Sequence, residues 1–271
     1  MLGDVAAPPF LMIRALLGSL VPCAACGRRA AGPHGACGPC RTRFADPATG
    51  GAETSSGPCA VAVAWCGPYD GPYRRAVRAL KYGGRRDVAR PLGHAVAERV
   101  RAERWPVARV AHVPLHPARR LRRGFDQAEV LGRRVATELG VPFRPSLRRL
   151  RPTRRQARLE GRARQANVDG AFRSAPVPPV PVLLIDDVLT TGATTAACAA
   201  ALRGAGARSV RIAVACRARP AADVRFVVPS WADAAHETAA EPGARQGVRT
   251  VQNANAVAVA TPSSAPASTC G

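Results

Sequence analysis

The stretch VLLIDDVLTTGATT, residues 182–195, constrains the fold of this chain more than any other segment. Two adjacent carboxylates, Asp186 and Asp187, follow directly on an apolar run that is typical of a buried strand. An ionised carboxylate is costly to remove from water unless something compensates its charge. A strand of an open parallel sheet accounts for this pattern, because ligands bind beyond the carboxyl ends of such strands. A capped helix after a buried strand would explain the threonines but not the two carboxylates.

The residues that follow this strand carry the groups that hold a phosphate. Thr190, Thr191, Gly192, Ala193 and Thr194 offer backbone N–H groups, hydroxyls and the start of a helix. Such groups cradle phosphate oxygens, and neighbouring carboxylates accept hydrogen bonds from sugar hydroxyls. The stretch therefore predicts a site for a ribose 5-phosphate.

Strands and helices alternate along most of the chain. The patterns predict strands over 60–65, 107–115, 182–186 and 209–216, and helices over 73–81, 87–103, 126–139 and 194–203. This alternation is typical of an α/β fold with a parallel sheet flanked by helices. We expect residues 1–58 to hold an N-terminal helix, a cysteine knuckle and a linker over 47–58. Residues 59–219 form the α/β domain, and the Ala/Pro/Ser/Thr-rich composition of 220–271 predicts a disordered tail.

Four of the nine cysteines form two C-x-x-C pairs. Cys23 and Cys26 make the first pair, and Cys37 and Cys40 make the second. Paired thiolates at this spacing grip one ion tetrahedrally, so we expect a structural Zn²⁺. Disulfides, which a cytoplasmic location disfavours, and chance are the alternatives. The other five cysteines show no paired spacing, and core packing or exposure accounts for them.

The apolar stretch 9–21 is the one segment that could be mistaken for a targeting or membrane sequence. Arg14 interrupts it, and it is shorter than the roughly 20 residues that a membrane span needs. No basic region precedes it, as one would in a secretory signal. We interpret it as a short amphipathic helix, and predict a cytoplasmic protein with no membrane span.

Positive charge is concentrated in the middle of the chain. The chain has 40 basic and 18 acidic residues, which gives +22. The part from Arg74 to Arg173 holds 27 basic and 8 acidic residues, or +19 of that total. Arginine is also abundant in proteins encoded by GC-rich genomes, but a chain this basic attracts phosphates whatever the origin of its charge. We therefore expect a polyanionic partner.

The stretch 182–195 closely resembles the phosphoribosyl-pyrophosphate signature of type I phosphoribosyltransferases. Three other segments, with the cysteine knuckle, resemble the ComF/GntX-type proteins: KYGGRRDVARPLG, VPLHPARRLRRGFDQAE and RPTRRQARLEGRARQANVDGAF. The resemblance covers residues 12–219. It implies a type I phosphoribosyltransferase-like fold and, in this family, a role that accompanies DNA uptake in competent bacteria.

The resemblance also implies roles for individual residues. Asp186 and Asp187 would bind the ribose hydroxyls, and the loop 190–194 would hold the 5-phosphate. Magnesium would bridge pyrophosphate and ribose. The loop after the strand 110–114 and the mobile loop 153–167 would contact pyrophosphate. The candidates for that contact are Leu115, His116, Arg119, Arg154 and Arg158, and Lys81 is a further candidate on separate grounds.

Two positions depart from the family pattern. Asp126 stands within RGFDQ where asparagine is usual, and an ion pair with Arg122 or Arg123 is one explanation. Thr190 stands where hypoxanthine-type enzymes carry an aspartate that acts as general base toward the purine. Salvage of a purine is therefore not expected, whereas transfer to an amine remains open.

Two functions of different classes fit these observations. The first is a phosphoribosyl-pyrophosphate-dependent transferase that acts on an amine or a base, for which the sequence identifies no catalytic residue. The second is a non-catalytic nucleotide- or DNA-binding competence factor, with single-stranded DNA and a competence helicase as partners. The nine arginines from Arg144 to Arg164 suit pyrophosphate or nucleic acid, although a solvated basic face is the simpler explanation. Lys81 is the only lysine, and either chance or contact with pyrophosphate would explain it.

Overall fold

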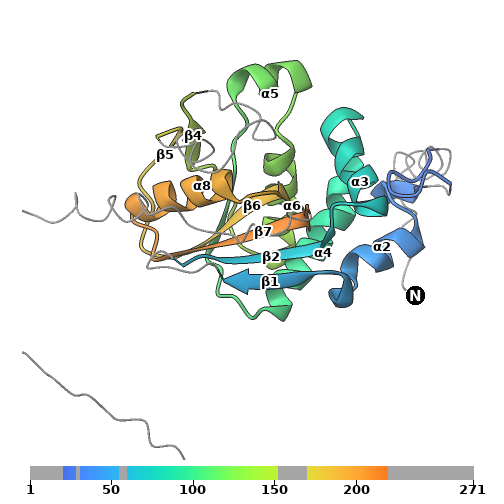
Figure 1. Ribbon diagram of the computed structural model, residues 1–271, viewed down its shortest axis with the longest axis horizontal. Helices are drawn as coiled ribbons and strands as arrows, with labels where there is room; N and C mark the ends of the chain where they lie inside the picture. The colour runs from blue at the N-terminus through green and yellow to red at the C-terminus, as the bar shows by residue number, and fades with distance from the viewer. Residues whose placement is uncertain (1–20, 29–30, 55–59, 152–169, 219–271) are drawn as a thin grey trace, which may run out of the picture. The chain divides into compact units, whose positions relative to one another are not determined.

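A computed structural model describes residues 21–28, 31–54, 60–151 and 170–218. Its centre is a five-stranded sheet with the order β1-β2-β7-β6-β3 (Figure 1). Neighbouring strands from β2 to β3 run parallel, and β1 pairs antiparallel with β2 at one edge. The strands are β1 Gly51–Thr54, β2 Ala62–Pro68, β3 Arg109–His112, β6 Pro181–Leu189 and β7 Ser209–Arg217. The predicted α/β class with a mainly parallel sheet is confirmed.

Helices cover both faces of this sheet. The α-helices are α2 Gly38–Ala45, α3 Gly71–Tyr82, α4 Ala89–Ala102, α5 Pro117–Arg123, α6 Gln127–Leu139 and α8 Ala193–Gly204. The short 3-10 turns are η1 Gly32–His34, η2 Pro47–Thr49 and η3 Arg86–Val88. A separate two-stranded sheet pairs β4 Leu147–Arg149 with β5 Phe172–Ser174.

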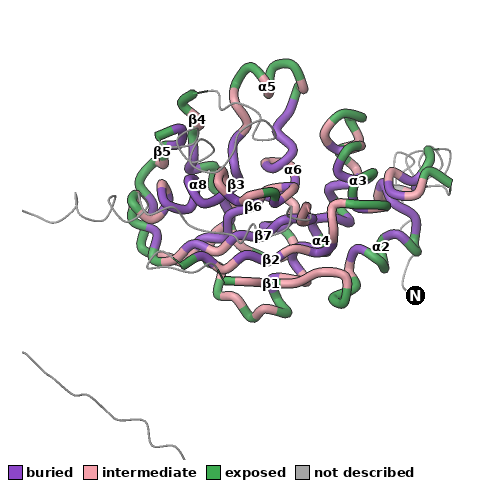
Figure 2. Tube along the Cα trace, viewed as in Figure 1, coloured by how far each residue is buried: buried purple, intermediate pink, exposed green. Residues whose placement is uncertain are grey.

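Alternate side chains of β6 point into two hydrophobic clusters. Leu183 and Ile185 join α3, α4 and α6 on one face, whereas Val182 and Leu184 join α8 and β5 on the other. This is the period of two that a pleated strand imposes. Most residues of β6 are buried (Figure 2), and a strand that is buried on both faces has an unbroken apolar run in its sequence.

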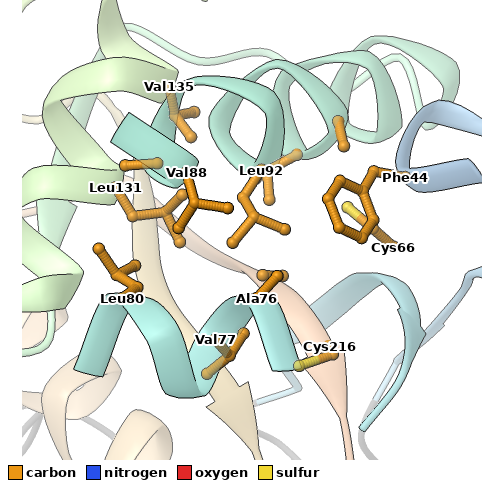
Figure 3. Packing of buried hydrophobic residues seen from close by; sticks show 14 of the residues in the cluster. Phe44, Cys66, Ala76, Val77, Leu80, Val88, Leu92, Leu131, Val135 and Cys216 are labelled. Carbon is orange, nitrogen blue, oxygen red and sulfur yellow. The ribbon is translucent and has the colours of Figure 1, made fainter. Parts of the chain in front are cut away.

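The cysteine knuckle shares its core with the larger body. Phe44 of α2 packs on Tyr73 of α3 with ring centroids 4.9 Å apart. Figure 3 shows Phe44 beside Cys66 and Leu92, in the same cluster of side chains that α3, α4 and α6 contribute. The knuckle is therefore held against α3 and α4 by apolar contact.

The predicted elements occur within a few residues of their expected bounds, with three differences. Gly51–Thr54, expected as linker, forms strand β1 and pairs with β2. The helix expected over 87–103 starts at Ala89, after a 3-10 turn. The helices α2 and α5 and the strands β4 and β5 were not predicted. The expected N-terminal helix (apart from Val21), the loop 153–167 and the tail lie outside the described residues.

Across the described ranges, each helix is too short or too polar to traverse a lipid bilayer.

Candidate functional site

The two acidic residues lie near the carboxyl end of β6, where parallel sheets bind ligands. The strand continues beyond them to Leu189, and Asp186 pairs in register with Val214 of β7. The pleat directs adjacent side chains to opposite faces. Asp187 continues the face of Leu183 and Ile185, toward α3. Asp186 continues the face of Val182 and Leu184, toward α8.

Lys81 neutralises one of the two carboxylates. Its Nζ lies 2.9 Å from Asp187 Oδ1, and the two side chains are only 17% and 5% exposed. Burial lowers the pKa of Lys81, but the charge and hydrogen bond of Asp187 raise it more, so its pKa lies above the usual value. The sequence singled out this lysine as a contact to pyrophosphate, and the structure places its ammonium on the acidic pair.

The remaining oxygens of the acidic pair are less well satisfied. Asp186 Oδ1 accepts a hydrogen bond from the backbone N–H of Asp187 at 2.8 Å. Asp187 Oδ2 is buried, and no hydrogen-bond partner for it occurs among the described residues. Burial, and then the charge of Asp187, raise the pKa of Asp186 well above its ordinary value. Groups shifted in this way concentrate at functional sites, where a ligand completes the hydrogen bonding.

The threonine loop connects β6 to α8. Gly192 has φ 78°, a left-handed conformation that suits glycine, and it forms the N-cap of α8. Thr195 Oγ1 donates to the Gly192 carbonyl at 2.8 Å, which fixes the turn. As a glycine, Gly192 has no side chain with which to cap the helix. The first N–H groups of a helix have no partner within the helix, and such groups bind anions. The predicted 5-phosphate site therefore lies at the N-terminus of α8.

Asp126 holds the loop that follows β3. Its Oδ2 accepts from the backbone N–H of Leu115 at 2.7 Å, and its Oδ1 accepts from Ala128 and Glu129 at the start of α6. His112 Nε2 lies 3.8 Å away. Burial lowers the pKa of His112, against the opposing charge of Asp126.

Asp126 therefore has a structural explanation that differs from the expected ion pair. Among the described residues, the basic side chain within 4.0 Å of its carboxylate is His112, and not Arg122 or Arg123. Arg123 instead donates to Gln127, and its guanidinium lies 5.1 Å from the Tyr82 ring centroid. The carboxylate at this position connects the β3 loop to α6.

The other residues predicted to contact pyrophosphate lie at or within α5, or outside the described residues. His116 is the N-cap of α5, and its Nδ1 accepts from the N–H of Ala118 at 3.3 Å. Arg119 is half-buried in the same helix. Arg154 and Arg158 lie outside the described residues.

One basic residue that lies near the site was not predicted from the sequence as a site residue. The pKa of Arg149 in β4 is lowered, chiefly by burial and then by the charge of Arg119. The charges of Asp186 and Asp126 act on it in the opposite direction. Its guanidinium lies 5.2 Å from the ring centroid of Phe172. The pairing of β4 with β5 positions Arg149 near the site. In the sequence, Arg149 is one of the nine arginines of 144–164 and has no signal of its own.

The four predicted ligand cysteines come together. The sulfur atoms of Cys23, Cys26, Cys37 and Cys40 all lie within 4.8 Å of one another. The 3.9 Å between Sγ of Cys26 and Sγ of Cys37 is close to the roughly 3.8 Å expected between sulfurs at about 2.3 Å from a tetrahedral zinc. No disulfide joins any of the cysteines in the described ranges. The quartet has the donor set of a structural zinc site.

Backbone groups of the knuckle support thiolate character at Cys23. Its Sγ accepts from the N–H of Cys37 at 3.3 Å and of Ala25 at 3.4 Å. Burial raises the pKa of Cys23, but hydrogen bonds from the backbone outweigh it and lower the pKa overall. Such bonds are the outer contacts that orient metal ligands. Cys66, Cys198 and Cys216 are buried in the core instead, as expected for cysteines without a partner.

Comparison with curated proteins finds relatives with DNA-related names. The chain is 34% identical over 156 residues to DNA utilization protein YhgH of Salmonella typhi, covering 55% of this chain and 69% of that protein. The YhgH protein of Escherichia coli is 31% identical over the same length, with the same coverage. Competence protein F of Haemophilus influenzae is 33% identical over 134 residues, covering 47% of this chain and 58% of that protein. No family model matches the chain.

Solved structures similar to this one include phosphoribosyltransferases. One is glutamine phosphoribosylpyrophosphate amidotransferase from B. subtilis, with a TM-score of 0.36, 17% identity and coverage of 51% of this chain and 30% of that chain. Another is adenine phosphoribosyltransferase from Leishmania tarentolae, with a TM-score of 0.30, 17% identity and coverage of 51% and 72%.

Proposed function

Because this chain belongs to the ComF/GntX-type family, which includes YhgH and competence protein F, we propose that it binds a phosphorylated ribose. The proposed ligand is phosphoribosyl pyrophosphate, and the proposed site is the carboxyl end of β6. The observation that carries this proposal is the position of Asp186 on the α8 face of β6, together with Gly192, which has no capping side chain, at the N-terminus of α8.

The two ends of the ligand have different requirements, and the site offers groups for each. The 5-phosphate would lie on the N–H groups and hydroxyls of residues 190–194, because a helix N-terminus favours an anion. A ribose hydroxyl would donate to Asp186, which faces the same side of the sheet. Asp187 lies on the opposite face of β6, where Lys81 engages its Oδ1, and would act on the ligand through its charge.

Magnesium fits this arrangement chiefly through the ligand. Lys81 already neutralises Asp187, so the ion would be held by the pyrophosphate and hydroxyl oxygens, with Asp186 as the nearest protein carboxylate. The ion would supply charge neutralisation for the leaving pyrophosphate. Arg119 and Arg149 are the arginines of the described chain that would share that task, because their charges act on the same buried region.

The second candidate function is binding without transfer, which the names of the relatives and the basic middle of the chain favour. In this alternative the chain uses the same sugar-phosphate site for a nucleotide, and contacts DNA during uptake. We also propose that Cys23, Cys26, Cys37 and Cys40 bind one structural zinc ion, because their sulfurs converge as a tetrahedral site requires.

Calorimetric titration tests the proposal. Phosphoribosyl pyrophosphate should bind in the presence of magnesium, ribose 5-phosphate should bind more weakly, and free ribose should not bind measurably. A pyrophosphate-release assay with ammonia and with free bases then separates a transferase from a binding protein. No binding of either phosphorylated sugar would refute the proposed function, whichever way the release assay turns out.

A further inference from the structure

Two neighbouring cavities form a groove between the knuckle and the α4–α6 face. The first has a volume of about 350 Å³ and lies between η1, α2, α4 and α6. The second has a volume of about 450 Å³ and lies between η3, α4 and α6. Arg90 and Arg134 line both cavities, so the two are neighbours. We refer to them together as the knuckle groove.

The lining of the knuckle groove is strongly basic. Its arginines come from four different elements of the fold: Arg41, Arg86, Arg90, Arg133 and Arg134. Arginine is the side chain best suited to bind phosphate, because its planar guanidinium donates two parallel hydrogen bonds. Such a concentration of like charge is unfavourable unless carboxylates or a bound anion compensate it.

Carboxylates compensate only part of this charge. Glu138 pairs with both Arg134 and His94, and Asp87 pairs with Arg85. Arg133 pairs with Glu129. Within the described residues, no ion pair or hydrogen bond engages the guanidiniums of Arg41 and Arg90. These two arginines leave a net positive charge in the first cavity.

The arginines of the first cavity converge on His34. The Nδ1 atom of His34 is buried, and the described chain provides no hydrogen-bond partner for it. Burial, and then the charges of Arg90, Arg41 and Arg134, lower the pKa of His34. The guanidiniums are therefore close to this imidazole, which lines the same cavity.

We propose that the knuckle groove binds phosphate groups, with Arg41 and Arg90 as the principal donors. The ligand is either the backbone of a single-stranded nucleic acid or the phosphate of a free nucleotide, since both present the same oxygens. This site is separate from the acidic pair of β6, and the proposal holds whether or not that pair binds a sugar phosphate.

Its position gives the knuckle a role beyond stability. His34 and Arg41 belong to the knuckle, whereas Arg90 and Arg134 belong to the body. A phosphate held between them would join the two parts, so binding requires the knuckle to be folded. A nucleic acid can place successive phosphates in both cavities, whereas a mononucleotide can fill only one.

The test uses the full zinc-loaded chain, with Arg41→Gln and Arg90→Gln combined. Anisotropy of a labelled single-stranded oligonucleotide is measured across a range of salt concentrations, and inorganic phosphate and AMP are tested as competitors. The affinity for the oligonucleotide should fall at least tenfold. The magnitude of the salt slope should fall by about 1.4, because each lost contact to a single strand contributes about 0.7.

Arg173→Gln with Arg208→Gln is the matched control, because both arginines are exposed and the control removes the same charge elsewhere. Zinc content and binding of phosphoribosyl pyrophosphate should be unchanged in both double variants, which shows that the fold and the β6 site are intact. If inorganic phosphate or AMP displaces the oligonucleotide only in the parent and the control, the groove is the phosphate site.

Two results would overturn the proposal. One is an Arg41→Gln, Arg90→Gln variant that binds the oligonucleotide, phosphate and AMP as the parent does. The other is an equal loss in the control variant, which would mean that general positive charge, not the groove, attracts the ligand. Binding of AMP without the oligonucleotide would support the site and assign it to a free nucleotide.

Discussion

Replacing Lys81 with methionine should be among the most destabilising single substitutions in the chain. Methionine keeps most of the length of the side chain but removes the ammonium that lies 2.9 Å from Asp187 Oδ1. At that distance, and with an effective dielectric constant of about 20, the attraction between two unit charges is about 6 kcal/mol. Desolvation of both groups offsets part of this attraction, so the pair adds less than that to stability. Breaking a buried pair from one side nevertheless costs about 3–5 kcal/mol, because the other charge stays buried.

Denaturant unfolding of the zinc-loaded protein at neutral pH measures this cost. Lys81→Met should lower the free energy of unfolding by about 3–5 kcal/mol. Arg74→Met on the exposed side of the same helix is the control, and should change it by less than about 0.5 kcal/mol. Lys81→Met combined with Asp187→Asn should be more stable than Lys81→Met alone, because it removes the orphaned charge. A loss below about 1 kcal/mol for Lys81→Met would refute the reasoning, since it would place the pair in the range of solvated surface pairs.

Three further substitutions test other parts of the structure. Cys37→Ser with Cys40→Ser should abolish the bound zinc, as measured by metal analysis of the purified protein, and full retention of zinc would contradict the assignment. Asp126→Asn should lower the free energy of unfolding by about 1 kcal/mol, because an amide has one acceptor oxygen where the carboxylate uses two; an unchanged value in denaturant unfolding would count against the connecting role. Gly192→Ala should cost about 1–2 kcal/mol of stability, measured in the same way, because φ is 78° there, and should also weaken binding of phosphoribosyl pyrophosphate. A variant as stable as the parent would show that the loop relaxes easily.

The central sheet could be predicted because its signals are local and strong. The apolar run that ends at Asp186 is unbroken because both faces of β6 are buried. The start of α6 could also be predicted, because Asp126 followed by Glu129 is a typical signal for the N-terminus of a helix. By contrast, β1 has only four residues and one solvated edge, so its composition resembles a linker.

The contacts of the acidic pair could not be predicted from local patterns. Lys81 meets Asp187 because α3 and β6 pack together, and no spacing in the sequence encodes that contact. From the sequence, Asp186 and Asp187 were predicted to have the same role, as acceptors for the ribose hydroxyls. Their different environments follow from the pleat of β6, which continues to Leu189 and not to the expected end at Asp186. The convergence of Arg41 and Arg90 on the knuckle groove likewise depends on tertiary packing.

Asp186→Asn tests the central claim most directly, because stability and ligand binding should change in opposite directions. The pKa of Asp186 is raised in the folded protein, so ionisation favours the unfolded state. The contribution of Asp186 to the stability of the parent should therefore be most favourable below the unfolded pKa of about 3.9, and should decrease as the pH rises toward the raised folded value. Asparagine cannot ionise, so the variant should be more stable than the parent at neutral pH, with a difference that vanishes near pH 4.

The deciding measurement is calorimetric titration of this variant with phosphoribosyl pyrophosphate and magnesium at neutral pH. Affinity should fall at least tenfold, which corresponds to about 1.4 kcal/mol, because a carboxylate accepts a hydroxyl hydrogen bond more strongly than an amide does. Denaturant unfolding of the same preparation should show the gain in stability. A variant that binds the ligand as tightly as the parent would contradict the assignment of this acidic pair to a sugar-phosphate site.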